Sequence, residues 1–247
     1  MSSKTRSIIA TTCISLLACA RAPAPTPVPT MAEIESAGIQ AVHAQHPTAL
    51  LALQKWATAG YPVAQRELAF AYATKPETHT QTRTWLEKAA KGGDTEAQFQ
   101  LAEAYYKGRW GLKSDYQQAY NWYEIAANNK EGRASFMLAR MSKYGQGTSQ
   151  DLATSVRWLK TASEQGNAQA MFLLSNAYAA GEGTDKNPAL ARKWLEESAE
   201  LEYPVAIQAL AMELETGSQH VEKDAVKARH LIKEASDERL MRWNRYQ

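Results

Sequence analysis

Apolar residues along most of the chain recur at helical spacing. Five segments open with an alanine and carry a leucine four residues later, one helical turn further along the same face. The alanines are Ala64, Ala97, Ala134, Ala170 and Ala206, and the leucines are Leu68, Leu101, Leu138, Leu174 and Leu210. The alanines are separated by 33, 37, 36 and 36 residues. A period of this length predicts an array of repeated structural units.

Each unit contains a second helical stretch after a helix-breaking residue. Eleven residues after the opening alanine stands a glycine, at Gly108, Gly145, Gly181 and Gly217, while Lys75-Pro76 takes this place in the first unit. A tryptophan then marks the second stretch, at Trp85, Trp122, Trp158 and Trp194. Asp115 and Asp151 stand seven residues before their tryptophans, where aspartate caps a helix. No segment alternates with period two for long, so the pattern predicts helix pairs and no sheet.

These positions resemble the Sel-like repeat, a bacterial relative of the tetratricopeptide repeat. The unit that matches well contains Ala170, Leu174, Tyr178, Gly181, Gly183 and Trp194. The resemblance covers 64–238, as repeats 64–96, 97–133, 134–169, 170–205 and 206–238. It implies an all-α fold, an α-solenoid of stacked antiparallel helix pairs that curves into a right-handed superhelix. Residues 32–63 are interpreted as a degenerate N-terminal helical pair, and 239–247 as a basic C-terminal tail.

The N-terminal residues have the layout of an export signal. Two basic residues precede an uncharged, mostly apolar run over 8–18, which is too short to span a bilayer and is typical of a secretory signal peptide. Residues 16–19 read Leu-Leu-Ala-Cys and resemble the lipobox of bacterial lipoproteins. This resemblance implies that residues 1–18 are a lipoprotein signal peptide and that Cys19 carries the lipid that attaches the protein to a membrane.

Residues 19–31 are interpreted as the lipid-anchor cysteine and a linker. Ala20 follows the cysteine where some lipoproteins carry aspartate, and by resemblance to proteobacterial lipoproteins this implies an outer-membrane lipoprotein that faces the periplasm. Four prolines alternate with other residues, at Pro23, Pro25, Pro27 and Pro29, and favour an extended spacer of about 3.1 Å per residue. An ordinary signal peptide cleaved near Ala22, which would remove Cys19, is the alternative.

Composition and charge restrict the class of partner. Apolar residues make up 45% of the chain and charged residues 22%, as in folded domains. The formal net charge is +2, and it falls to zero when the two basic residues of the signal are removed. Because no clustered basic excess is present, a nucleic-acid partner is not expected. The two cysteines, Cys13 and Cys19, supply neither a disulfide framework nor a cysteine zinc site.

The sequence lacks the usual motifs of catalysis and cofactor binding. It contains no G-x-S-x-G, P-loop, G-x-G-x-x-G or H-E-x-x-H motif. His43 and His46 have the spacing of one helix face, but no third ligand stands at a recognisable metal spacing. Residues 145–147 and 181–183, each G-x-G, are interpreted as turns between helices and not as phosphate-binding loops. We therefore expect no enzyme and no cofactor or metal site, with a cell-wall-modifying enzyme as an alternative.

Most aromatic residues are assigned to packing. One tryptophan per second helix is what a core between repeats requires, so Trp158→Ala is expected to cost about 3–5 kcal/mol. The phenylalanines two residues after an opening alanine, Phe99, Phe136 and Phe172, are assigned to packing as well. Trp110 and Trp243 stand outside the pattern beside arginines, so they are candidate contact residues.

The curved surface of the array is the candidate binding site. In a solenoid of helix pairs, we expect the first helices to line an extended concave groove. Helical spacing places eight residues toward it: Arg66, Phe70, Glu103, Tyr106, Arg140, Lys143, Asn176 and Met212. Their mixture of aromatic, charged and amide groups suits a protein or peptide partner. The sequence thus predicts a lipid-anchored envelope adaptor or scaffold, and a soluble secreted effector or host-interaction factor is the alternative.

Overall fold

Helices form the regular structure of residues 28–44, 46–217 and 223–233, which are the residues that the computed structural model describes. They are α1 (Met31–His43), α2 (Pro47–Thr58), α3 (Pro62–Ala73), the 3-10 turn η1 (Pro76–Thr78), α4 (His79–Lys91), α5 (Thr95–Lys107), α6 (Tyr116–Asn128), α7 (Gly132–Tyr144), α8 (Leu152–Glu164), α9 (Ala168–Ala180), α10 (Pro188–Glu200) and α11 (Pro204–Thr216), followed by a helix over 225–233. Consecutive helices form pairs that stack on one another, which confirms the predicted all-α solenoid.

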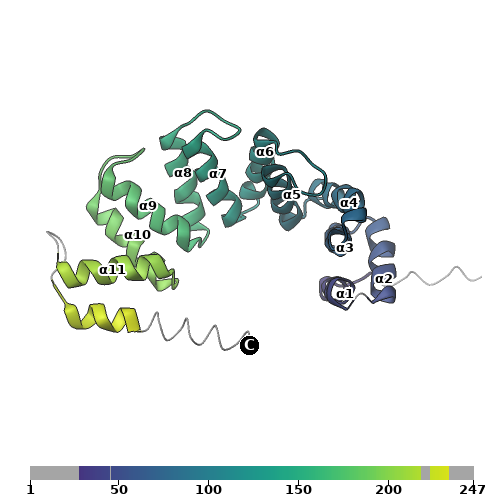
Figure 1. Ribbon diagram of the computed structural model, residues 1–247, viewed down its shortest axis with the longest axis horizontal. Coiled ribbons are helices and arrows are strands. Elements are labelled where there is room, and N and C mark those ends of the chain that lie inside the picture. The colour runs from purple at the N-terminus through teal and green to yellow at the C-terminus, as the bar shows by residue number, and fades with distance from the viewer. Residues whose placement is uncertain (1–27, 45, 218–222, 234–247) are drawn as a thin grey trace, which may run out of the picture.

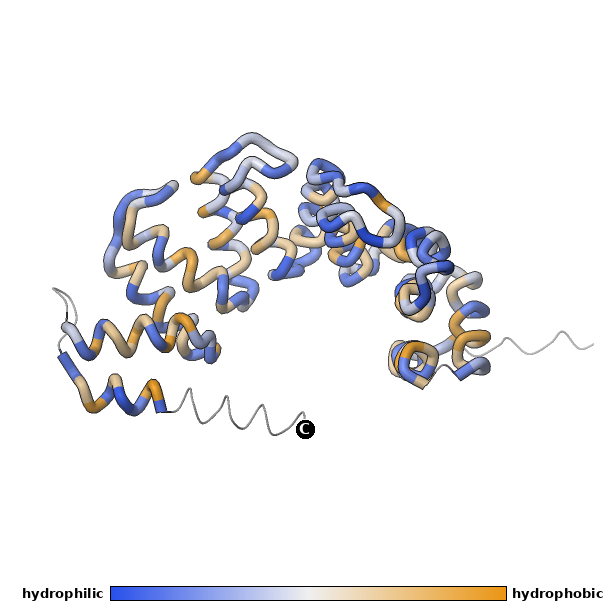
Figure 2. Tube along the Cα trace, in the orientation of Figure 1, coloured by the Kyte–Doolittle hydropathy of each residue, from blue (hydrophilic) through white to orange (hydrophobic). Residues whose placement is uncertain are grey.

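The helix pairs stack into an arch, which runs in Figure 1 from α1 and α2 at one end to α11 and the helix over 225–233 at the other. In the purple-to-teal half, α1, α3 and α5 lie toward the inside of the curve, and α2, α4 and α6 lie toward the outside. Apolar and polar stretches alternate along the helices in Figure 2, as amphipathic packing requires. Within the described ranges, no helix is long and apolar enough to cross a membrane.

Helix ends lie at the residues that the sequence pattern assigned to them. Asp115 accepts a hydrogen bond from the backbone N–H of Gln118 at 3.0 Å, and Asp151 accepts one from Thr154 at 3.0 Å, so both aspartates cap second helices. Left-handed glycines end the first helices at Gly108, Gly145 and Gly181, with φ of 66°, 67° and 77°. Only glycine adopts this conformation without the steric cost of a Cβ atom.

The second-helix tryptophans pack against the core without being buried in it. Trp85, Trp122, Trp158 and Trp194 are all partly exposed. The residue after each tryptophan is the buried one, namely Leu86, Tyr123, Leu159 and Leu195, which are 0 to 7% exposed. The expectation that the tryptophans themselves fill the core is therefore corrected, because the next position along the helix points inward. Accordingly, Trp158→Ala should cost less than truncation of a fully buried tryptophan.

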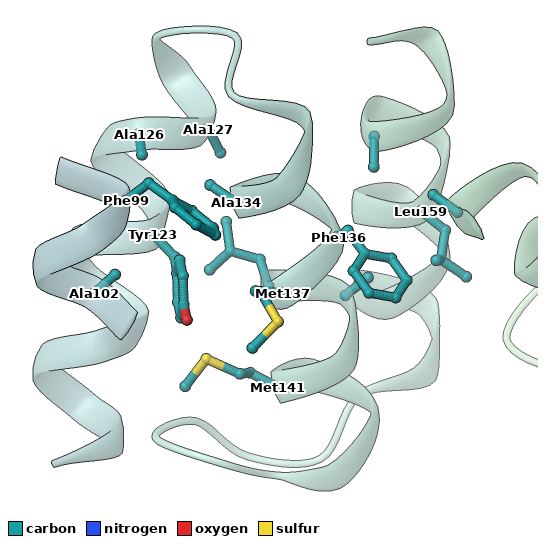
Figure 3. Close-up of a cluster of buried hydrophobic side chains, with 14 of the residues drawn as sticks. Phe99, Ala102, Tyr123, Ala126, Ala127, Ala134, Phe136, Met137, Met141 and Leu159 are labelled. Atoms are coloured by element: carbon teal, nitrogen blue, oxygen red, sulfur yellow. The ribbon is translucent and has the colours of Figure 1, made fainter. Parts of the chain in front are cut away.

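In the centre of the arch, one core cluster extends over several helix pairs. Figure 3 shows part of the central cluster, in which Phe99, Tyr123 and Met137 lie between α5, α6 and α7, and Phe136 lies beside Leu159 of α8. Phe99 and Phe136 are each 8% exposed, as expected for packing residues. Since buried residues from several pairs form this one cluster, each pair depends on its neighbours for burial of its apolar surface.

The second glycine of each G-x-G turn brings neighbouring pairs into contact. A Cβ atom on Gly147 would lie 2.2 Å from the carbonyl oxygen of Tyr116, and one on Gly183 would lie 2.4 Å from that of Leu152. These turns therefore connect two helices, as predicted, and also touch the preceding second helix. Trp110 stands thirteen residues after its opening alanine, like Gly147 and Gly183, and has a positive φ of 52°.

Gly147→Ala should destabilise the protein more than Gly166→Ala does. Both glycines have positive φ, 70° and 83°, so both alanine variants incur the conformational cost of about 1–2 kcal/mol. A Cβ on Gly166 meets nothing within 4 Å, whereas one on Gly147 meets backbone, which adds about 1–3 kcal/mol of overpacking. Urea unfolding of both variants measures the difference, and equal losses of stability would contradict the close contact.

Candidate partner-binding surface

The eight residues predicted to face the groove all lie on first helices. Arg66 and Phe70 lie on α3, Glu103 and Tyr106 on α5, Arg140 and Lys143 on α7, Asn176 on α9 and Met212 on α11. Three of them, Arg140, Lys143 and Asn176, line one hollow between α7, α8 and α9. The other five do not line this hollow, and most of them make contacts within the chain.

The hollow combines an apolar floor with a charged rim. Its volume is about 280 Å³, and Val156, Leu159 and Leu173 form much of its apolar surface. At the rim, Lys143 Nζ lies 2.8 Å from Glu182 Oε1, an ion pair that joins α7 to the turn between α9 and α10. Both side chains are about 40% exposed, so the pair contributes little to stability.

Polar groups in the hollow are left available for a ligand. Arg140 is exposed; its Nη1 lies 3.8 Å from the sulfur of Met137, and it forms no ion pair with a carboxylate among the described residues. The Asn176 side chain makes no hydrogen bond within this part of the chain. Ser155 is 4% exposed and lines the hollow, yet its hydroxyl has no hydrogen-bond partner in the described ranges. The Ser155 hydroxyl is therefore available to form a hydrogen bond with a ligand.

The hollow lies where several side chains are smaller than their counterparts one repeat earlier. We call the contact region of three consecutive helices a junction. At the junction one repeat earlier, between α5, α6 and α7, the equivalent repeat positions are occupied by Tyr106, Tyr116, Tyr120, Tyr123, Met137 and Met141. In the hollow they are Lys143, Leu152, Val156, Leu159, Leu173 and Ala177. The Tyr106 hydroxyl donates to Gln146 Oε1 at 3.0 Å, where the later junction has the pair between Lys143 and Glu182. The earlier junction is therefore filled by the chain itself.

Glu103 has a structural role in the filled junction. It is 8% exposed, and its carboxylate accepts hydrogen bonds from the Tyr123 hydroxyl and from Lys107. Burial opposes the charged form, but these two hydrogen bonds together with the charges of Lys107 and Arg109 outweigh it and lower the pKa of Glu103 from its ordinary value of 4.5. Burial, reinforced by the hydrogen bond to Glu103, raises the pKa of Tyr123. Glu103 is thus committed to contacts within the chain.

Arg66 is likewise engaged in contacts within the chain. Its guanidinium lies 2.9 Å from Asp94 Oδ2 and 2.8 Å from Glu67 Oε1, and 3.7 Å from Glu35 Oε1. These ion pairs link α1, α3 and the N-terminus of α5. Burial raises the pKa of both Glu67 and Asp94, although the charge and hydrogen bonds of Arg66 oppose the shift. The cluster joins consecutive helix pairs at the N-terminal end of the arch.

The remaining candidates are scattered. Phe70 and Trp110 are partly buried against the cluster around Leu86 and Leu101, and Met212 is 62% exposed on α11. Trp243 and the tail 239–247 lie outside the described residues, as do Cys19 and the signal segment. No group of three His, Cys, Asp or Glu residues in the described ranges is arranged to hold a metal ion.

Sequence reasoning did not find the parts of the hollow that come from second helices and turns. Ser155 stands three residues before its tryptophan, where the other repeats carry Thr82, Ala119 and Ala191. Because Thr82 also carries a hydroxyl at this position, the sequence alone did not distinguish Ser155. Glu182 lies between two turn glycines, and only the folded chain brings it next to Lys143.

Comparisons with known proteins agree with the repeat pattern. The family description "Sel1 repeat" matches residues 79–94, 95–130, 132–167, 168–203 and 204–239. Each of the last four matches begins at the first residue of a first helix, α5, α7, α9 or α11. A comparison with curated proteins found no match.

Two solved structures resemble the chain along most of its length. One is c5321, a protective antigen of uropathogenic Escherichia coli strains with an SLR fold, which is 30% identical with a TM-score of 0.70. The similarity covers 76% of this chain but 41% of that one, so the chain spans less than half of the relative. A Sel1 repeat protein from Oxalobacter formigenes is 23% identical with a TM-score of 0.68, and the similarity covers 83% of this chain and 85% of that one. At this identity, the similarity to the Oxalobacter formigenes protein supports a shared fold and nothing further.

Tyr123→Phe should destabilise the protein by about 1–3 kcal/mol at neutral pH, because it removes a hydrogen bond from the buried Glu103 carboxylate. The folded-state pKa of Glu103 is lowered, so this stabilisation is present above pH 4.5 and is lost as the pH falls through the folded pKa. Urea unfolding at neutral and acidic pH should therefore show a difference from wild type that shrinks in acid. Tyr116→Phe, at an exposed tyrosine, is the control, and an equal effect of both variants would contradict the role of Glu103.

Proposed function

Because the chain belongs to the Sel1 repeat family, we propose that it is a lipid-anchored adaptor of a bacterial cell envelope, which binds a protein partner through its helical-repeat groove. The hollow between α7, α8 and α9 is the observation that carries this proposal, because three residues expected to face the groove meet there. Within the described residues, Arg140 forms no ion pair with a carboxylate and the Asn176 side chain makes no hydrogen bond. Such a site is suited to binding, and we propose no catalytic activity for it.

The anchoring part of the proposal rests on the N-terminal sequence. Leu-Leu-Ala-Cys at residues 16–19 supports lipidation of Cys19, and the proline-rich residues that follow support a spacer between lipid and folded body. With Ala20 after the cysteine, we place the protein at the outer membrane, facing the periplasm. The adaptor would then hold its partner close to the membrane surface.

A second candidate function is that of an exported host-interaction factor. The Escherichia coli relative is described as a protective antigen, and this observation favours the second candidate. The two candidates differ in whether the N-terminus carries a lipid. Metabolic labelling with a fatty acid separates them, because an adaptor anchored through Cys19 incorporates the label and a soluble exported factor does not.

Cys19→Ala should abolish acyl labelling and release the protein from membranes. A single acyl chain anchors a protein only marginally and several chains anchor it stably, so the loss of the modified cysteine should release nearly all of it. Labelling and membrane fractionation of wild type and variant measure this. Cys13→Ala serves as the control, because Cys13 lies in the proposed signal peptide. A Cys19→Ala protein that stays on the membrane like wild type would show that the anchor proposal is wrong.

The double variant Tyr106→Ala and Arg140→Ala should weaken capture of a partner from envelope extracts by at least about 2 kcal/mol, since tyrosine and arginine dominate many interfaces. Tyr106 is partly buried, so circular dichroism and thermal unfolding must show that the variant stays folded. Arg157→Ala, at an exposed arginine of α8 that does not line the hollow, is the matched control. Normal capture by the double variant would argue against the groove.

A further inference from the structure

We propose that the hollow between α7, α8 and α9 recognises an acidic segment of the partner protein, which places an aliphatic side chain on the apolar floor and a carboxylate against Arg140. This inference rests on the proposed function and deepens it by naming the chemistry of the partner. It also assigns a role to Glu182, which competes with the partner's carboxylate for Lys143.

The apolar floor determines which side chain enters. Val156, Leu159 and Leu173 line it, and no aromatic residue does, so a planar ring has no surface on which to stack. The hollow measures about 280 Å³, at the lower limit of the about 300–1,000 Å³ that is usual for small-molecule sites. This volume has room for an aliphatic side chain of a longer segment.

The preceding junction shows how such a hollow is filled. There Tyr123 and Met141 occupy the positions of Leu159 and Ala177, and Tyr123 is completely buried. The chain thus completes one junction with its own side chains and leaves the next one open. We infer that a side chain of the partner takes the place that the larger residues fill one repeat earlier.

The polar groups around the hollow favour a carboxylate. Arg140 has a rigid, planar guanidinium that pairs well with carboxylates, and among the described residues no carboxylate occupies it. Asn176 stands at the same rim, and the unpartnered hydroxyl of Ser155 faces the hollow. With Arg140 and Lys143 opposed by Glu182, the lining carries a net charge of +1.

Glu182 controls access to the second cation. Its carboxylate holds Lys143 at 2.8 Å, the position at which an acidic ligand would bind. Because both side chains are substantially exposed, the ion pair is weak and can be exchanged for a ligand's carboxylate. Removal of the Glu182 charge should therefore strengthen binding, an effect that a purely structural ion pair would not produce.

Titration with short blocked peptides of alanine that carry a central Glu-Leu-Asp tests the inference directly. Binding to the full chain without its signal peptide is followed by backbone amide shifts in NMR spectra. We expect shifts confined to α7, α8, α9 and the turn at Glu182, with a dissociation constant on the order of 1 mM. Replacement of the peptide's leucine with alanine, or of its acids with their amides, should each weaken binding by about tenfold.

Three variants test the contributions of the charged rim and of the apolar floor to peptide binding. Arg140→Gln should weaken peptide binding by about tenfold, through loss of a charged hydrogen bond. Glu182→Gln should strengthen it by about two- to fivefold, through release of Lys143. Ala177→Met, which copies Met141 of the filled junction, should block the floor and abolish binding while the protein stays folded. Arg157→Gln is the control and should bind like wild type.

Several outcomes would overturn the inference. They are the absence of shifts in α7 to α9 at peptide concentrations of about 5 mM, equal binding of the acidic and the amide peptides, and weaker binding by Glu182→Gln. Capture experiments keep the two proposals apart. If the Tyr106 and Arg140 double variant loses its partner while Arg140→Gln and Ala177→Met retain it, the groove is the binding surface and the hollow is not its recognition pocket.

Discussion

Close approach of consecutive helix pairs is the constraint on which the rest of the structure depends. The opening alanine of every repeat is completely buried, and the glycines Gly147 and Gly183 leave no room for a Cβ atom against the preceding second helix. Protein interiors are packed too densely to absorb an added methyl group at such points. Small residues at fixed intervals therefore set the spacing of the pairs, and this spacing shapes the curved surface.

Polar contacts between pairs follow from the same spacing. Gln65 and Gln98, each next to an opening alanine, donate to the carbonyl oxygens of Ala57 and Ala90 at 3.1 Å. These carbonyls lie in the last turns of the preceding second helices, where they also accept hydrogen bonds from the backbone N–H groups of Gly60 and Gly93. In the next pair Ser135 occupies this position and bonds Gln165, which reaches Ala127. Different side chains thus donate hydrogen bonds to carbonyl oxygens at the C-terminal end of each second helix.

Variation between repeats leaves a hollow where the packing is incomplete. Tyrosines and methionines fill the junction between α5, α6 and α7, and Glu103 accepts the hydrogen bond that the buried Tyr123 hydroxyl requires. One repeat later, leucine, valine and alanine leave a hollow, and an arginine stands where Glu103 was. The matching positions of the two junctions thus differ in side-chain volume and charge. This arrangement is the reason to regard the hollow as a binding feature of a repeat array.

The sequence by itself determined the helix pairs, their breaks and their order, because alanine spacing, glycine stops and capping aspartates act within a few residues of one another. It also placed Arg140, Lys143 and Asn176 on one side of the first helices. Only the tertiary structure decided that Leu159 and not Trp158 is buried, that Arg66 and Glu103 are engaged in contacts within the chain, and that Ser155 and Glu182 join the hollow. Those outcomes depend on contacts between repeats about thirty-six residues apart, where the volume of one side chain determines the space left for another.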